Sequence, residues 1–93
     1  MTSHIVSIKL NNSIVDIDKL NVDTVTNCAD SEDITNIEVK NGVTTFNLYG
    51  IRFIFMDNRL SSFLIMSSND KYENKVVLID SFGQEYDIQD RYN

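Results

Sequence analysis

The stretch Ile34-Thr-Asn-Ile-Glu-Val-Lys-Asn-Gly-Val-Thr-Thr-Phe-Asn-Leu-Tyr49 decides the fold. Asn-Gly at its centre, between two alternating strands, is the strongest short-range mark of a β-hairpin, because both residues tolerate the positive φ of a type I′ turn. We therefore predict strands over 34–40 and 43–49. The turn also predicts the register, which pairs Ile37 with Phe46, Thr35 with Leu48, Glu38 with Thr45 and Asn36 with Asn47.

Two further hairpins are predicted nearer the ends of the chain. The first joins strands over 4–10 and 13–18 through Asn11-Asn12, and the last joins 75–80 and 84–89 through a loop that ends at Gly83, which suits a left-handed position. The expected partners in the first hairpin are Ile8 with Val15, Val6 with Ile17, Ser7 with Asp16 and Ile5 with Asp18. Those in the last are Leu78 with Tyr86 and Val76 with Ile88.

Residues 51–66 form a long apolar run after Gly50. The parity of the apolar positions changes at Gly50, which favours a β-bulge or a bend there. Asp57-Asn58 is expected to turn the chain into a strand over 59–66, which sets Phe55 opposite Leu60 and Ile51 opposite Leu64. A short helix over 59–66 is the alternative, because the apolar residues of that segment also fit helical spacing.

As strands, residues 51–66 would be apolar on both faces. One face would carry Ile51, Phe53, Phe55, Leu60 and Leu64, and the other Ile54, Met56, Phe63 and Ile65. Either the rest of the fold covers the second face, or that face contacts another copy or a partner.

The segment 19–33 fits neither the strand nor the helix period well. We expect a short strand over 22–26 and a brief helical turn near Ser31. Together these elements predict a mainly β protein, in which antiparallel hairpins form a small sandwich, a barrel or a strongly bent sheet of about 6–7 strands with at most one short helix. The length predicts a single domain over 1–93.

Composition restricts the class of partner. The chain has 14 acidic and 8 basic side chains, for a net charge of −6, which disfavours direct binding to nucleic acid or to an anionic membrane. The lone cysteine, Cys28, excludes an internal disulfide and fits a reducing compartment, and we expect a cytoplasmic protein without export signal or membrane span. No motif predicts a cofactor.

The acidic residues fall in two segments. Residues 16–38 contain seven acids against one base, and residues 80–90 contain four acids and no base. If the two segments are neighbours in space, they form a negative surface that matches a basic partner; otherwise they solvate loops and strand faces. The candidate partner-binding residues are Asp16, Asp18, Asp23, Asp30, Glu32, Asp33, Asp80, Glu85 and Asp87.

Catalytic groups are sparse. The only histidine, His4, lies 24 positions from Cys28, and no pair of carboxylates has an evident desolvated cleft. Asp16-x-Asp18 and Asp30-x-Glu32-Asp33 offer hard oxygen ligands for calcium without the spacing of an EF-hand loop. We therefore predict neither an enzyme nor a metal site.

The favoured function is a protein-binding module whose acidic surface docks on a basic, nucleic-acid-handling protein. A small phage-encoded inhibitor of a host nucleic-acid or defence enzyme would act in this way. The attribution to a phage rests on small size and on a composition rich in Asn and Ile without Pro or Trp. The alternative is a structural or assembly subunit that forms homodimers or larger homo-oligomers through an apolar sheet face.

Overall fold

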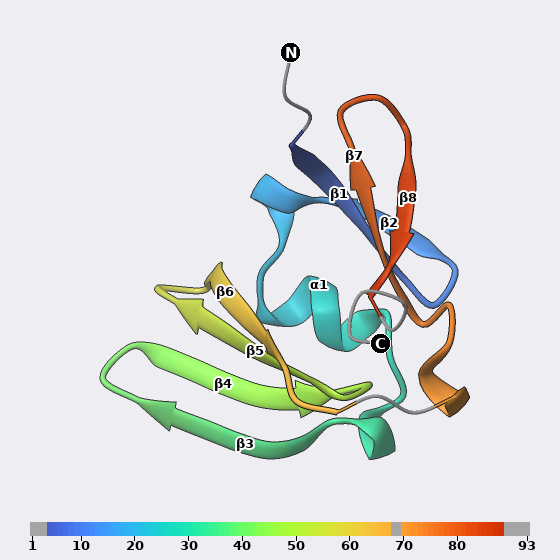
Figure 1. Ribbon diagram of the computed structural model, residues 1–93. Helices are drawn as coiled ribbons and strands as arrows, with labels where there is room; N and C mark the ends of the chain where they lie inside the picture. The colour runs from blue at the N-terminus through green and yellow to red at the C-terminus, as the bar shows by residue number, and fades with distance from the viewer. Residues whose placement is uncertain (1–3, 68–69, 89–93) are drawn as a thin grey trace.

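The computed structural model describes residues 4–67 and 70–88, within which eight antiparallel strands form two four-stranded sheets (Figure 1). Sheet A has the order β2-β1-β7-β8 and comprises β1 (Ile5–Leu10), β2 (Ser13–Asp16), β7 (Val76–Asp80) and β8 (Glu85–Asp87). Sheet B has the order β3-β4-β5-β6 and comprises β3 (Thr35–Lys40), β4 (Val43–Leu48), β5 (Ile51–Met56) and β6 (Arg59–Ile65). The predicted mainly β fold of antiparallel hairpins is confirmed.

Sheet B is a meander in which three two-residue turns join its four strands. All six turn residues have positive φ, as type I′ turns require: Asn41 and Gly42, Tyr49 and Gly50, Asp57 and Asn58. The predicted turns at Asn41 and Asp57 are therefore confirmed, whereas at Gly50, where a bulge or a bend was predicted, the chain makes a full reversal instead of a bulge. Tyr49-Gly50 reverses the chain, so that Leu48 pairs with Ile51, and this reversal accounts for the change in apolar parity.

Two bulges change the predicted registers within sheet B. Asn36 has a φ of 54° and the pairing shifts beside it, so Thr35 lies opposite Asn47 instead of Leu48. In β6 the extra residue is Ser61, because Ile54 pairs with Ser62 while Phe55 pairs with Leu60 as predicted.

The bulge at Ser61 also decides which face of β6 is buried. Beyond it Ile51 pairs with Ile65 instead of Leu64, and Leu64 points outward with 53% exposure while Phe63 and Ile65 pack on the core. The helical alternative for residues 59–66 is therefore wrong.

Sheet A contains the first and last predicted hairpins. Ser7 pairs with Asp16, Ile8 with Val15 and Leu78 with Tyr86, as predicted. The strand expected over 13–18 ends at Asp16, however, because the 3-10 helix η1 (Ile17–Lys19) takes the chain away from β1. The expected pairs of Val6 with Ile17 and of Ile5 with Asp18 therefore do not form.

The last hairpin closes as expected at its loop. Gly83 has a φ of 82°, as a left-handed position requires. The strand β8 ends at Asp87, which pairs with Val77, so the expected strand pair of Val76 with Ile88 does not form. Residue 89, the end of the expected strand, lies outside the described residues.

The connection between the sheets is helical. The strand predicted over 22–26 is wrong: this segment is the helix α1 (Val22–Asn27), and Asn21 and Thr24 close its first turn with reciprocal side-chain-to-backbone hydrogen bonds of 2.9 and 2.8 Å. The helical turn expected near Ser31 is confirmed as η2 (Ser31–Asp33). Another short 3-10 helix, η3 (Asp70–Tyr72), precedes β7.

One hydrophobic core joins the two sheets and α1. Its centre is a set of three buried rings, with Phe46 5.8 Å from Phe53 and 5.5 Å from Phe55 between centroids. The helix, which lies between the sheets in Figure 1, contributes Val25 with 0% exposure. Both sheets therefore present one face to this core and one to their surroundings, and the outer faces are where a partner could bind.

Candidate functional site

The register of sheet A brings the start of the first acidic segment and part of the second onto one face. Asp16 pairs with Ser7, Ser7 pairs with Ile79, and Ile79 pairs with Glu85, so these four residues form one row across the sheet. Paired residues point to the same side, and the core-facing row beside this one contains the buried Ile8 and Leu78, so the row of Asp16 and Glu85 faces outward. The two carboxylate-bearing residues are three interstrand spacings apart, or about 14 Å.

The next row on the same side of the sheet is only partly accessible, because its central residue, Val77, is 6% exposed. It pairs Ile14 with Lys9, Lys9 with Val77, and Val77 with Asp87. Asp18 stands beside Asp16, because both line an open hollow of about 440 Å³ at the end of the sheet, with His4 on the same rim. We call the surface carrying Asp16, Asp18, Glu85 and Asp87 the acidic face.

Asp16 and Asp87 of the acidic face both have contacts with neighbouring residues. Lys19 Nζ lies 3.9 Å from Asp16 Oδ2, and both side chains are more than half exposed, so this ion pair is weak. Ser7 Oγ is 3.4 Å from Asp16 Oδ1, and Asp87 accepts the Asn74 backbone N–H at 2.9 Å. Ser7 and Asn74 thus each place a neutral hydrogen-bond donor against one carboxylate of the acidic face.

Asp80, predicted to bind a partner, has a structural role instead. Its side chain is 3% exposed. One carboxylate oxygen accepts the backbone N–H groups of Phe82 and Gln84, both at 2.9 Å, and the other accepts the Tyr86 hydroxyl at 2.9 Å. The prediction for this residue is therefore corrected: Asp80 fixes the loop between β7 and β8 and contributes no accessible carboxylate.

The remaining predicted acids lie away from the acidic face. Asp23 is in the first turn of α1, while Asp30, Glu32 and Asp33 lie at η2, directly before β3 of the other sheet. Four of the nine predicted residues thus share one surface, four are exposed elsewhere and one is buried.

A second feature, which no sequence pattern predicts, is a pocket of about 510 Å³ around Tyr49. Glu32 and Asp33 line it together with Lys71, Tyr72 and Lys75. The Lys75 ammonium lies 5.8 Å from the centroid of the Tyr49 ring, and the Lys71 ammonium lies 5.2 Å from that of Tyr72. Acidic and basic groups are both present, so this pocket has no strong preference for one sign of charge.

Tyr49 is held at an unusual backbone conformation. Its φ is 53°, which is rare for a bulky residue, and its side chain is 6% exposed. Asn11 Nδ2 donates to the Tyr49 hydroxyl at 2.8 Å, and that hydroxyl lies 3.5 Å from Asp33 Oδ2 as a donor. The two hydrogen bonds connect the turn of sheet B to sheet A and to η2.

Burial raises the pKa of the Tyr49 phenol above its ordinary value of 10.0, and the nearby carboxylates of Asp33 and Asp30 add to the increase against the lowering effect of the Asn11 amide. Tyr49 is therefore a neutral hydrogen-bonding group at physiological pH, and it is not activated as a base or nucleophile. Its evident role is to hold the two sheets in position.

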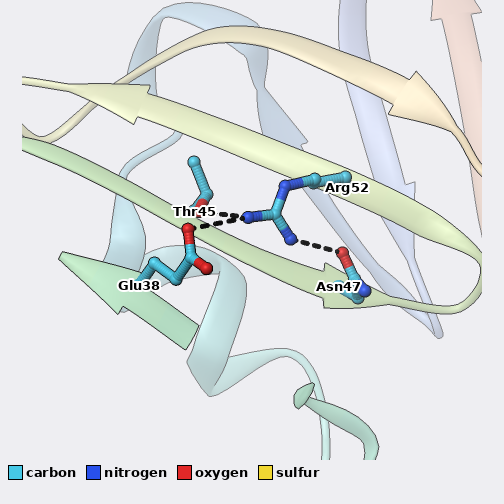
Figure 2. A network of polar contacts seen from close by, with 4 residues as sticks. All are labelled: Glu38, Thr45, Asn47 and Arg52. Atoms are coloured by element: carbon cyan, nitrogen blue, oxygen red, sulfur yellow. Dashed lines mark hydrogen bonds and ion pairs between the residues drawn. The ribbon is translucent and has the colours of Figure 1, made fainter. Parts of the chain in front are cut away.

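The outer face of sheet B has the opposite charge to the acidic face. The outward positions of its strands include Lys40, Arg52 and Arg59 against one acid, Glu38. Figure 2 shows Arg52 at the centre of this face, where it donates to Asn47 Oδ1 at 2.9 Å and to Thr45 Oγ1 at 2.7 Å.

The same face carries part of the apolar surface that the sequence predicts for it. Ile54, Met56 and Leu64 point outward, but Arg52 and its polar partners separate them from the edge at β3. Phe63 and Ile65, predicted to lie on this side, are turned to the core by the bulge at Ser61. The prediction for the second face is therefore confirmed for Ile54 and Met56 and wrong for Phe63 and Ile65.

Comparisons of the chain with protein-family models, with curated proteins and with solved structures give no match. Among the described residues, no three or more His, Cys, Asp or Glu side chains gather as metal ligands would. No helix within residues 4–67 and 70–88 has the length and apolar character needed to cross a membrane.

Proposed function

We propose that this chain is a non-enzymatic protein-binding module that docks on a basic protein surface through its acidic face. The observation that carries the proposal is the outward row across sheet A that joins Asp16 to Glu85, with Asp18 and Asp87 beside it. Carboxylates gathered on one face attract a basic surface over a distance of about 10 Å at moderate salt and raise the rate of association.

The charge difference between the two outer faces adds to this attraction. Three acids stand against Lys9 on the outer face of sheet A, and three bases stand against Glu38 on that of sheet B. Such a dipolar molecule orients in the field of a basic partner with its acidic face leading, so fewer encounters are unproductive.

The class of partner follows from the chemistry of the acidic face. Basic protein surfaces of the required extent are those that bind nucleic-acid phosphates, and the carboxylates would occupy the positions of those phosphates. We therefore propose a cytoplasmic nucleic-acid-handling or defence enzyme as the partner, and inhibition of that enzyme, as by a small phage-encoded protein, as the outcome.

Capture from a bacterial lysate by matched variants tests the proposal. The face variant D16N/E85Q/D87N removes three charges from the acidic face, and the control D23N/D30N/E32Q removes three from exposed positions elsewhere. We expect the wild-type chain and the control to retain the same basic protein at about 0.1 M salt and to release it at about 1 M, where the Debye length is only about 3 Å.

The face variant should retain at least about tenfold less of that protein. Equal retention by the face variant, retention at about 1 M salt, or the absence of any captured protein would each count against the proposal.

A further inference from the structure

The edge of sheet B formed by β3 is open along its length. All six residues of Thr35–Lys40 are exposed, and the strand has one neighbour, β4 (Figure 1). Ile37 and Val39 are 63% and 72% exposed. An edge strand of this kind offers unpaired backbone groups together with apolar side chains to an incoming strand.

The other sheet edges are less available. β2 has four residues and β8 has three. β6, at the far edge of sheet B, is partly covered, because its Leu60 N–H donates to the carbonyl of Leu20 at 3.3 Å. Among the described strands β3 is thus the longest edge without such a cover.

The type I′ turn at Asn41-Gly42 determines which backbone groups of β3 face outward. Residues that flank a two-residue turn exchange hydrogen bonds with each other, so Lys40 exchanges them with Val43. Hydrogen-bonded pairs recur at every second residue, so Glu38 exchanges them with Thr45. Val39 alternates with them and directs its N–H and C=O groups to the open edge.

We propose that β3 pairs antiparallel with β3 of a second copy of this chain, about a two-fold axis that passes through Val39. Val39 then exchanges two backbone hydrogen bonds with Val39 of the other copy. In the same register each Glu38 lies opposite a Lys40 on the outer face of the joined sheet, so two symmetry-related pairs of opposite charge form.

The neighbouring registers are less favourable. An axis through Glu38 would set two carboxylates directly opposite each other, and an axis through Ile37 would bring the bulge at Asn36 into the paired segment. Charge complementarity therefore selects the register in which Val39 is on the axis.

The Arg52 network prepares Glu38 for this role. Arg52 Nη2 is 3.4 Å from Glu38 Oε2, while its hydrogen bonds to Thr45 and Asn47 fix the guanidinium, as Figure 2 shows. The Glu38 side chain is 75% exposed, so it is positioned over the outer face and still accessible to a second cation. In the dimer its carboxylate lies between Arg52 of its own chain and Lys40 of the other copy.

Only about four residues per strand lie beyond the bulge, so the interface belongs to the small class that associates weakly. Sedimentation velocity over a concentration series up to about 1 mM measures this association. Reversal of one charge, K40E, sets two pairs of carboxylates opposite each other and should weaken dimerisation about five- to thirtyfold. The double reversal E38K/K40E restores opposite charges, so its dimer should be at least about threefold tighter than that of K40E.

The matched control is R59E, which makes the same change in net charge on the same outer face at the opposite edge of the sheet. It should leave the dimer constant within about twofold. The hydrogen exchange of the Val39 amide provides an independent measurement, and it should slow as protein concentration rises.

Four results would each overturn the proposal. These are a chain that stays monomeric throughout the series, equal effects of K40E and R59E, a double reversal no better than K40E, and a Val39 amide whose exchange does not depend on concentration.

Discussion

Replacement of Gly50 by alanine should destabilise the turn that joins β4 to β5, and the distances around Gly50 set the size of the loss in the free energy of unfolding. A Cβ at this position would lie 2.7 Å from the backbone oxygen of Ser67 and 3.2 Å from Cδ2 of Tyr72, and the Gly50 φ is +78°. Gly83 has nearly the same backbone conformation, with a φ of +82°, but nothing lies within 4 Å of a Cβ built there. Gly83→Ala is therefore a matched control that isolates the close approach.

The two substitutions share the cost of a left-handed alanine, about 1–2 kcal/mol, less about 0.4–1 kcal/mol because the unfolded chain also loses freedom. Gly83→Ala should thus lower the free energy of unfolding by about 1 kcal/mol. Gly50→Ala must also move the strand-to-loop backbone at Ser67, which adds about 1–3 kcal/mol of overpacking. The same movement strains the hydrogen bond that the Gly50 carbonyl accepts from the Met66 N–H at 2.7 Å.

Urea denaturation of the two variants measures the difference. With a slope of about 1–2 kcal/mol per molar urea, the midpoint for Gly50→Ala should fall about 0.5–3 M below that for Gly83→Ala. Coincident midpoints would refute the tight turn at Tyr49-Gly50 and would favour the bulge or bend that the sequence predicts at Gly50.

Three other predictions concern single side chains. Tyr49→Phe should lose about 1 kcal/mol at neutral pH, because Asn11 Nδ2 loses one of its two acceptors and keeps only the Cys28 carbonyl. The pKa of Tyr49 is raised on folding, so the contribution of its hydroxyl to the free energy of unfolding is fully present below about pH 10 and is lost as pH rises through the folded-state pKa. The urea midpoints of the wild type and Tyr49→Phe should therefore converge in alkali, and a constant gap would contradict this. Asp80→Ala should lower the free energy of unfolding by about 2–4 kcal/mol, because the Tyr86 hydroxyl and two loop N–H groups lose their acceptor, and a loss below about 0.5 kcal/mol in urea would contradict its structural role. Asn21→Ala should cost about 1 kcal/mol in a thermal or urea melt while Asn21→Ser costs less, and equal losses would argue against the cap of α1.

Turn chemistry is the part of the fold that the sequence predicts best. Asn41-Gly42 and Asp57-Asn58 pair residue types that accept positive φ, so both turns follow from local preference. At Gly50 the change in apolar parity indicated only a bulge or a bend, and tyrosine, which rarely adopts positive φ, gave no local signal of a turn. Tertiary contacts, the Asn11 hydrogen bond above all, stabilise it there.

The candidate site depends on pairing that no local pattern encodes. Asp16 and Glu85 share a row because β1 pairs with β7, and these strands come from the first and the last hairpin of the chain. Segment charge predicts that a negative surface can exist, but it does not reveal that β1 and β7 are neighbours. Nor does it reveal the burial of Asp80, whose partners belong to its own loop.

The most direct test of the proposed acidic binding face is the association rate constant of the captured partner, measured as a function of salt. Between about 0.05 and 0.5 M salt, the rate constant for the wild-type chain and for D23N/D30N/E32Q should fall at least about tenfold, because screening removes the attraction between the faces. The rate constant for D16N/E85Q/D87N should start lower and change much less. Equal salt dependence for all three proteins would contradict the acidic face as the binding surface.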